Sequence, residues 1–160
     1  MGEIKVQCNH GYIYRGGEIV NGWLHLTYKM SRHPSSPRVK VWRKLKSLGA
    51  LHLHDAIWLL PKNAYTYEQF QWLTVEIRDF GGEATMWESQ LLFGLSVEEI
   101  NQLFVEQINE KYAELLRTLD DETLDLISLS KKYQQIKKID YFESPLQLKV
   151  REKIIRRRSD

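Results

Sequence analysis

Basic side chains between Glu18 and Asp55 are the groups in this sequence best suited to bind an anion. No acidic residue interrupts that window. Its cations are Lys29, Arg32, Arg38, Lys40, Arg43, Lys44 and Lys46. Because the whole chain carries a formal net charge of only +2, this excess is local. A local positive field attracts phosphate groups or another oxyanion, which an even scatter of charge does not do.

Most of these cations fall on one expected helix, residues 37–48. Ser36 followed by Pro37 is typical of a helix start, because serine can accept a hydrogen bond from a free N–H group and proline suits the first helical position. Gly49 ends the pattern. The apolar residues at spacings of three, four and seven predict a buried stripe of Val41, Trp42, Leu45 and Leu48. The lysines and Arg43 then face water or a partner.

These exposed cations suit contacts with DNA phosphates, each of which releases counterions and makes the affinity fall with salt. The alternative is a face that only keeps the protein soluble. No residue set obviously reads base edges, so sequence specificity would depend on Arg32, Arg38 or the spacing of two subunits in a dimer. We therefore assign DNA binding to Arg32, Arg38, Lys40, Arg43, Lys44 and Lys46.

Arg38 falls among the apolar positions of this helix, in its first turn. Its guanidinium would reach back over the helix start and join Ser35, Ser36 and the free N–H groups in an anion site. The positive end of the helix dipole, two hydroxyls and a planar fork of donors suit a tetrahedral oxyanion such as phosphate or chromate. The alternative is an ion pair with Asp55 or Glu83 that holds the helix on a sheet.

The elements around this helix predict one compact α+β unit over residues 22–95. Alternation predicts a strand at 22–30, a bent strand or tight hairpin at 51–61 and an extended segment at 83–93, and a helical period predicts a second helix at 65–80. A βαββαβ order of this kind folds as an antiparallel sheet with both helices on one face, the ferredoxin-like arrangement. Residues 1–21 form either an N-terminal arm or a loose hairpin.

A helical extension is expected over residues 96–160. Ser96 with acids behind it is an N-terminal helix signature, and a long apolar stripe follows as far as Leu119. Residues 120–122 offer a turn or a second cap. Further helices are expected at 124–139 and 146–158. Acids dominate from Glu83 to Asp125 and cations from Lys131 to Arg158, so the charged zones could pair with one another in a monomer or a dimer.

Composition excludes several classes of protein. With 160 residues, 42% hydrophobic and 28% charged, the chain is an ordinary globular one. No apolar run approaches the ~20 residues that cross a bilayer, and the first 21 residues do not resemble a secretory signal. We therefore expect a cytoplasmic protein with no membrane contact.

Cysteine, histidine and tryptophan predict structural roles. The single Cys8 cannot form an internal disulfide, and with His10 alone beside it it cannot close a metal site. His25, His52 and His54 could lie on adjacent strands, but without a carboxylate set we expect no metal there. The tryptophans are expected in core and dimer contacts rather than in a stacking platform for bases: Trp23, Trp42, Trp58, Trp72 and Trp87.

Several motifs, in this order, resemble the N-terminal region of the chromate-resistance regulator ChrB. They are WLHLTYK at 23–29, PSSPRVKVWRKLKSLGA at 34–50, LHLHDAIWLLP at 51–61, GGEAT at 81–85, YAEL at 112–115 and IDYFESP at 139–145. The resemblance implies a bacterial transcription regulator of a chromate-efflux locus, whose N-terminal region binds operator DNA and responds to chromate. Complete members of that family look about twice as long, so the resemblance implies that this sequence is either a piece of such a protein or a stand-alone short form. If the remaining half carries part of the chromate sensor, the resemblance implies DNA binding for this sequence more firmly than chromate sensing.

An enzyme is the reading that the residues favour least. Small CRISPR-associated nucleases share the expected unit and use an acid near the end of the first strand to hold a metal, but here that strand ends with Lys29. No nucleophile–base pair or phosphate-cradling glycine loop replaces it. We expect no catalytic residue, metal or cofactor, and a homodimeric regulator with operator DNA and possible oxyanion effectors as partners. The alternative is an interaction module whose basic helix docks on an acidic protein surface.

Overall fold

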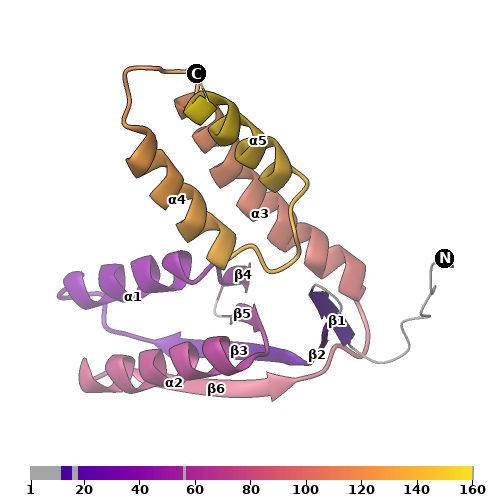
Figure 1. Ribbon diagram of the computed structural model, residues 1–160. Coiled ribbons are helices and arrows are strands. Elements are labelled where there is room, and N and C mark those ends of the chain that lie inside the picture. The colour runs from indigo at the N-terminus through magenta and orange to yellow at the C-terminus, as the bar shows by residue number, and fades with distance from the viewer. Residues whose placement is uncertain (1–11, 16–17, 56, 160) are drawn as a thin grey trace, which may run out of the picture.

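The computed structural model describes residues 12–15, 18–55 and 57–159 (Figure 1). Within them the protein is a mixed α/β chain with a four-stranded antiparallel sheet and five helices. A first pair of strands is β1 (Tyr12–Arg15) and β2 (Glu18–Asn21). The next elements are β3 (Trp23–Lys29), α1 (Ser36–Ser47), β4 (Leu51–His54), β5 (Ile57–Pro61), α2 (Ala64–Asp79) and β6 (Glu83–Ser89). Three helices follow, α3 (Val97–Thr118), α4 (Leu126–Lys138) and α5 (Leu146–Ser159).

The predicted order of strand, helix, hairpin, helix and strand is confirmed. The strands lie in the order β4-β5-β3-β6, and each strand is antiparallel to its neighbours. Residues 51–61 form the tight hairpin, with an irregularity in the register between His52 and His54. In the segment expected to be an arm or a hairpin, β1 and β2 pair as antiparallel strands. Residues 1–11, 16 and 17, and with them Cys8 and His10, lie outside the described residues.

One core joins the sheet to α1 and α2. Leu24 and Leu26 alternate with less buried residues of β3, as expected for a strand with two different faces. The helices bury an apolar stripe against the sheet, with Val41 and Leu45 from α1 and Phe70, Leu73 and Ile77 from α2. The sheet and its own core therefore hold α1 in place, so that only its outer side is open to solvent.

A second core lies between α3, α4 and α5, which pack together as a bundle (Figure 1). The Ser96 hydroxyl accepts a hydrogen bond from the backbone N–H of Glu99, and the Glu99 carboxylate accepts one from the Ser96 N–H, so the predicted N-terminus of α3 is a capping box. Of the two alternatives for residues 120–122, the structure shows the turn, and the cap of α4 is Asp125. The apolar stripe of α3 is buried as predicted.

The bundle docks on the C-terminal end of α1 through residues 139–145. Tyr141 donates a hydrogen bond from its hydroxyl to the carbonyl of Leu48 at 2.6 Å. Gly49 has a φ of +69°, and a Cβ there would lie 2.9 Å from the Cβ of Ile139. Phe104 of α3 also stacks on Trp23, with ring centroids 5.9 Å apart. These contacts fix α4 relative to α1.

The expectation that Trp42 is buried is wrong. Trp42 is 49% exposed, although its spacing placed it in the buried stripe. Consecutive helical residues are about 100° apart, so Trp42 stands at the margin of a stripe centred on Val41, where the sheet does not cover it. Phe80, which caps the C-terminal end of α2, is 39% exposed. Of the five tryptophans only Trp23 and Trp58 are buried in the core.

We expect Gly49→Ala to destabilise the protein more than Gly81→Ala does. Both glycines have positive φ, but nothing lies within 4 Å of a Cβ at Gly81. Gly81→Ala should therefore cost only the backbone strain, about 1–2 kcal/mol, whereas Gly49→Ala adds a clash with Ile139 of roughly 1–3 kcal/mol. Urea denaturation followed by circular dichroism measures both. Equal losses would show that residue 139 yields without cost.

We expect Tyr112→Phe to lower the free energy of unfolding by about 1–3 kcal/mol. The Tyr112 hydroxyl donates a buried hydrogen bond of 3.0 Å to the Asp140 carboxylate, and its loss leaves the carboxylate with one partner fewer. Tyr133→Phe is the matched control, because the Tyr133 hydroxyl has no hydrogen bond to the described residues and should cost much less.

The same variant should change the pH dependence of stability. Burial, together with the Asp140 carboxylate, raises the pKa of Tyr112 above its ordinary value. As the pH rises, the unfolded state therefore loses the Tyr112 proton before the folded state does. The contribution of the protonated Tyr112 hydroxyl to the free energy of unfolding is complete below pH 10.0 and is lost as the pH rises above it. Urea melts at increasing alkaline pH should show a steeper loss in the natural protein than in Tyr112→Phe. Parallel curves would contradict this.

Candidate nucleic-acid interface

The outer side of α1 presents cations that the fold leaves open. Arg43 and Lys44 are both exposed and have no ion pair with a carboxylate of the described residues. The first turn of α1 holds no acidic residue, and Lys44 lies in the last turn. Val41 and Leu45, buried on the opposite side, direct these two side chains away from the sheet. The expected exposed pair is therefore present.

Lys40 departs from this pattern. Its Nζ lies 2.5 Å from Oε1 of Glu76 on α2, and 5.2 Å from the centre of the Phe80 ring. The expectation that every cation around α1 is free of carboxylates is thus wrong for Lys40, because α2 packs beside α1 and brings an acid of its own. The Lys40 side chain is 65% exposed, so the pair contributes little to stability.

Lys46 is held against aromatic rings. Its Nζ lies 5.9 Å from the centre of the Trp42 ring and 5.8 Å from that of Trp58. The His52 ring stacks on the Trp58 ring, with their centroids 4.4 Å apart. A cation over an aromatic face keeps its full charge, because the ring attracts it without neutralising it. Lys46 thus adds to the positive field at the edge of α1.

A small hollow of about 250 Å³ lies at the start of α1, lined by Tyr28, Ser35, Arg38, Val39 and Trp42. Arg38 is exposed and makes no ion pair with Asp55 or Glu83, so the intramolecular pair considered above is absent. Burial raises the pKa of Tyr28, and the positive charge of Arg38 partly offsets the rise.

The structure brings only part of the expected oxyanion set together. Ser35 is the residue that precedes the helix, and its side chain makes no capping hydrogen bond. Ser36 is the first residue of α1 rather than its cap, and it does not line the hollow. Arg32 is exposed in the loop that leads into α1. Ser35 and Arg38 therefore share the hollow, and Arg32 and Ser36 flank it in the chain.

Metal-binding side chains do not gather anywhere in residues 12–15, 18–55 and 57–159, where no three His, Cys, Asp or Glu side chains could hold an ion together. His25 is half-buried beside the Ser89 hydroxyl, and His52 stacks on Trp58. None of the described helices is both long and apolar enough to cross a membrane. That the chain lacks catalytic activity stays a prediction.

The sequence indicated for the basic residues of α4 only a pairing with the acidic zone, yet two cavities lie along that helix. One measures about 640 Å³ and the other about 500 Å³, and Lys138 lines both. The signal was present in the sequence as Lys131 and Lys138, which are seven residues apart and so lie on one side of a helix. The sequence alone could not show that these two lysines line a cavity, because it does not show which side of α4 faces the bundle.

Comparison with known proteins identifies a family for this chain. The family described as the N-terminal region of Protein ChrB matches residues 38–135. Protein ChrB of Cupriavidus metallidurans (strain ATCC 43123 / DSM 2839 / NBRC 102507 / CH34) is 26% identical over 132 residues. That alignment takes in 75% of this chain but only 40% of the relative, so the chain spans well under half of that protein's length. No solved structure matches significantly.

The match to the family covers more than half of the chain and includes most of α1, the whole of α2 and α3, and most of α4. It confirms the resemblance to this family, although the motifs at 23–29 and 139–145 lie outside the matched residues. The chain therefore belongs to the ChrB N-terminal family.

Proposed function

We propose that this protein is a transcription regulator of chromate resistance that binds operator DNA through α1. Membership of the ChrB family supports the chromate-resistance context. The observation that carries the DNA contact is the exposed pair Arg43 and Lys44, which no carboxylate of the described residues neutralises. Phosphate groups bind such cations by releasing counterions, and the gain is largest where no acid competes.

The shape of α1 supports the same proposal. Its 12 residues make a rod of about 18 Å, short enough to lie in or across the major groove of a duplex. Lys46 and the exposed Trp42 extend the surface along one edge, and Arg38 and Arg32 extend it toward the start of the helix. Lys40 contributes less, because binding DNA would compete with Glu76.

The proposed fold of residues 22–95 is ferredoxin-like. The element order β3-α1-β4-β5-α2-β6 and the strand order β4-β5-β3-β6 support it. Each helix then connects two strands that are not neighbours, which is the split βαβ connection of that arrangement. The proposal includes a cytoplasmic, non-enzymatic homodimer, whose two copies of α1 would contact successive half-sites of an operator.

A second role, the response to an oxyanion, rests on the hollow beside Arg38. One tetrahedral anion could accept hydrogen bonds from the Arg38 guanidinium, from the Ser35 hydroxyl, which makes no capping hydrogen bond, and from the N–H groups at the start of α1. Chromate and sulfate have the same charge and shape, so sulfate is a safe probe for the site. The competing proposal, docking of α1 on an acidic protein surface, is favoured by one observation, the pairing of Lys40 with Glu76 within this chain.

We expect Arg43→Ala with Lys44→Ala to weaken DNA binding and to flatten its salt dependence. Each phosphate contact contributes about 0.9 to the slope of log affinity against log salt, so the double variant should lose about 1.8 from the slope. Mobility shifts with DNA from the locus, from about 50 to about 200 mM salt, measure it. Lys149→Ala with Arg156→Ala removes the same charge from the exposed side of α5 and is the control. Natural protein that shifts no DNA would favour the protein-docking alternative.

We expect sulfate to raise the melting temperature of the natural protein but not of Arg38→Ala. At a concentration ten times the dissociation constant, binding stabilises by about 1.4 kcal/mol, which is roughly 3–6 °C in a chain of this size. Sulfate also stabilises proteins non-specifically, so Arg78→Ala, an exposed arginine at the end of α2, is the control. Equal rises in all three proteins, against chloride at the same ionic strength, would rule out an anion site at Arg38.

A further inference from the structure

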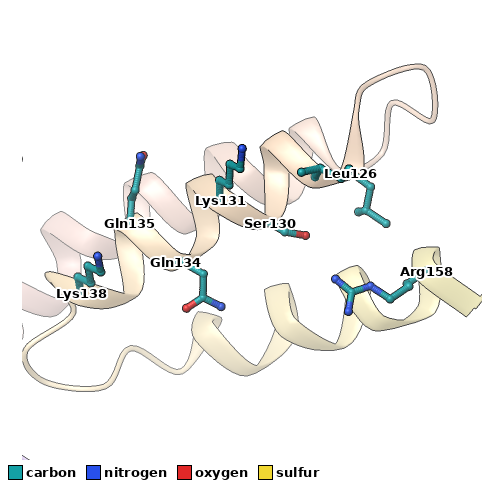
Figure 2. Close-up of a pocket in the computed structure, with 8 residues that line it drawn as sticks. Leu126, Ser130, Lys131, Gln134, Gln135, Lys138 and Arg158 are labelled. Atoms are coloured by element: carbon teal, nitrogen blue, oxygen red, sulfur yellow. The ribbon is translucent and has the colours of Figure 1, made fainter.

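The two cavities along α4 lie next to each other, and we call them together the α4 trough. Gln135 and Lys138 line both of them. The larger cavity, about 640 Å³, extends along α4 to Arg158 near the end of α5 (Figure 2). The other, about 500 Å³, reaches Ser47 at the end of α1 and Lys111 of α3. The trough therefore leads from the cationic helix α1 across α4 to the far end of the bundle.

Uncompensated cations line this trough. Lys131, Lys138 and Arg158 are exposed and have no ion pair with a carboxylate of the described residues. The carboxylate that does line it, Glu114, is bound by Lys132 at 2.9 Å. The hydrogen bond and charge of Lys132 lower the pKa of Glu114, so it stays ionised and paired. The trough thus carries a net positive charge along its whole length.

The directions of the side chains fit an extended anion. Figure 2 shows Lys131, Gln135 and Lys138 pointing to the same side of α4, while Ser130 and Gln134 point toward α5. The buried Ser130 hydroxyl has no hydrogen-bond partner among the described residues. Lys131, Gln135 and Lys138 therefore offer donors to phosphate oxygens along one side of α4, whereas Ser130 and Gln134 face α5.

The spacing along α4 also suits a nucleic-acid backbone. Lys131 and Lys138 are two helical turns apart, about 10.5 Å along the axis, which is close to three base-pair steps of about 3.4 Å on one strand. The whole of α4 extends for about 20 Å. Ser47 lies one turn after Lys44 on α1 and donates a hydrogen bond to its carbonyl, so the cations of α1 lead directly into the trough.

We propose that the α4 trough, through Lys131 and Lys138, binds the phosphate backbone of the same nucleic acid that contacts α1. The inference deepens the proposed function and rests on it. An acidic amphipathic helix of a partner protein is the other class of occupant, and Leu126 and Ile127 would suit it. Those two side chains lie in the first turn of α4, and the apolar residues at its other end, Ile136 and Ile139, are buried or half-buried. Because exposed cations continue along the helix between them, the charge pattern favours nucleic acid.

The test compares variants in one salt series. Fluorescence anisotropy of a labelled duplex of about 30 base pairs and arbitrary sequence, between about 50 and about 200 mM KCl, reports phosphate contacts independently of the operator. The natural protein, Lys131→Ala with Lys138→Ala, Arg43→Ala with Lys44→Ala, and the control Lys149→Ala with Arg156→Ala are compared. The control residues lie about 180° from Arg158 around α5. Thermal melts confirm that each variant is folded.

The α4 variant should lose about 1.8 from the salt slope, while the control keeps the natural slope. If the α4 variant and the control lose the same amount, the effect is one of total charge and the inference is wrong. If the α1 variant loses slope and the α4 variant does not, the inference falls while the proposed function stands. The reverse result leaves α4 as the binding surface and removes α1 from it.

A competitor distinguishes the two classes of occupant. Polyglutamate is titrated against the natural protein and the Lys131→Ala, Lys138→Ala variant. If polyglutamate binds with a dependence on these lysines and the duplex does not bind, the trough belongs to an acidic protein and the nucleic-acid inference is overturned. If the duplex binds with that dependence and polyglutamate binds much more weakly, the inference is supported.

Discussion

The close contact at the end of α1 is the constraint on which the proposed surface depends. Gly49 allows the chain to turn with positive φ and leaves no space for a Cβ beside Ile139. Tyr141 then bonds the Leu48 carbonyl, which the end of the helix would otherwise leave to water. Because residues 139–145 follow α4 directly, this contact helps to hold the bundle at the end of α1, together with hydrogen bonds from Gln107 of α3 to the carbonyls of Gly49 and Ala50. Two basic helices from separate hydrophobic cores are thereby held as one surface.

Charge compensation decides which cations of that surface can act. Lys40 sits beside α2 and meets Glu76, Lys132 meets Glu114, and Lys153 meets Asp120. In contrast, Arg43 and Lys44 on α1 have no such partner among the described residues. The total charge of +2 hides this division, because the acids of α3 neutralise some cations of the bundle and leave others free. Function is therefore proposed from the unpaired cations alone.

Much of the fold could be predicted from local pattern, and less of the site. Periodicity and turn residues predicted the order of the elements and the start of α3 at Ser96, because these signals are local. Trp42 was misplaced because periodicity does not show how far a sheet extends under a helix. The partner of Lys40 could not be predicted, because Glu76 belongs to another helix. The trough along α4 was missed for the same reason, since it depends on how the bundle docks on α1.

A residue-resolved titration tests whether the free cations on α1 and α4 bind the DNA backbone. Amide chemical shifts of the labelled protein are recorded as a short duplex is added at low salt and again after salt is raised. If these cations bind the backbone, the largest changes in amide chemical shift will lie at Arg43, Lys44, Lys131 and Lys138, and high salt will reverse them. Changes centred on Lys149 and Arg156, or none at saturating duplex, would contradict it.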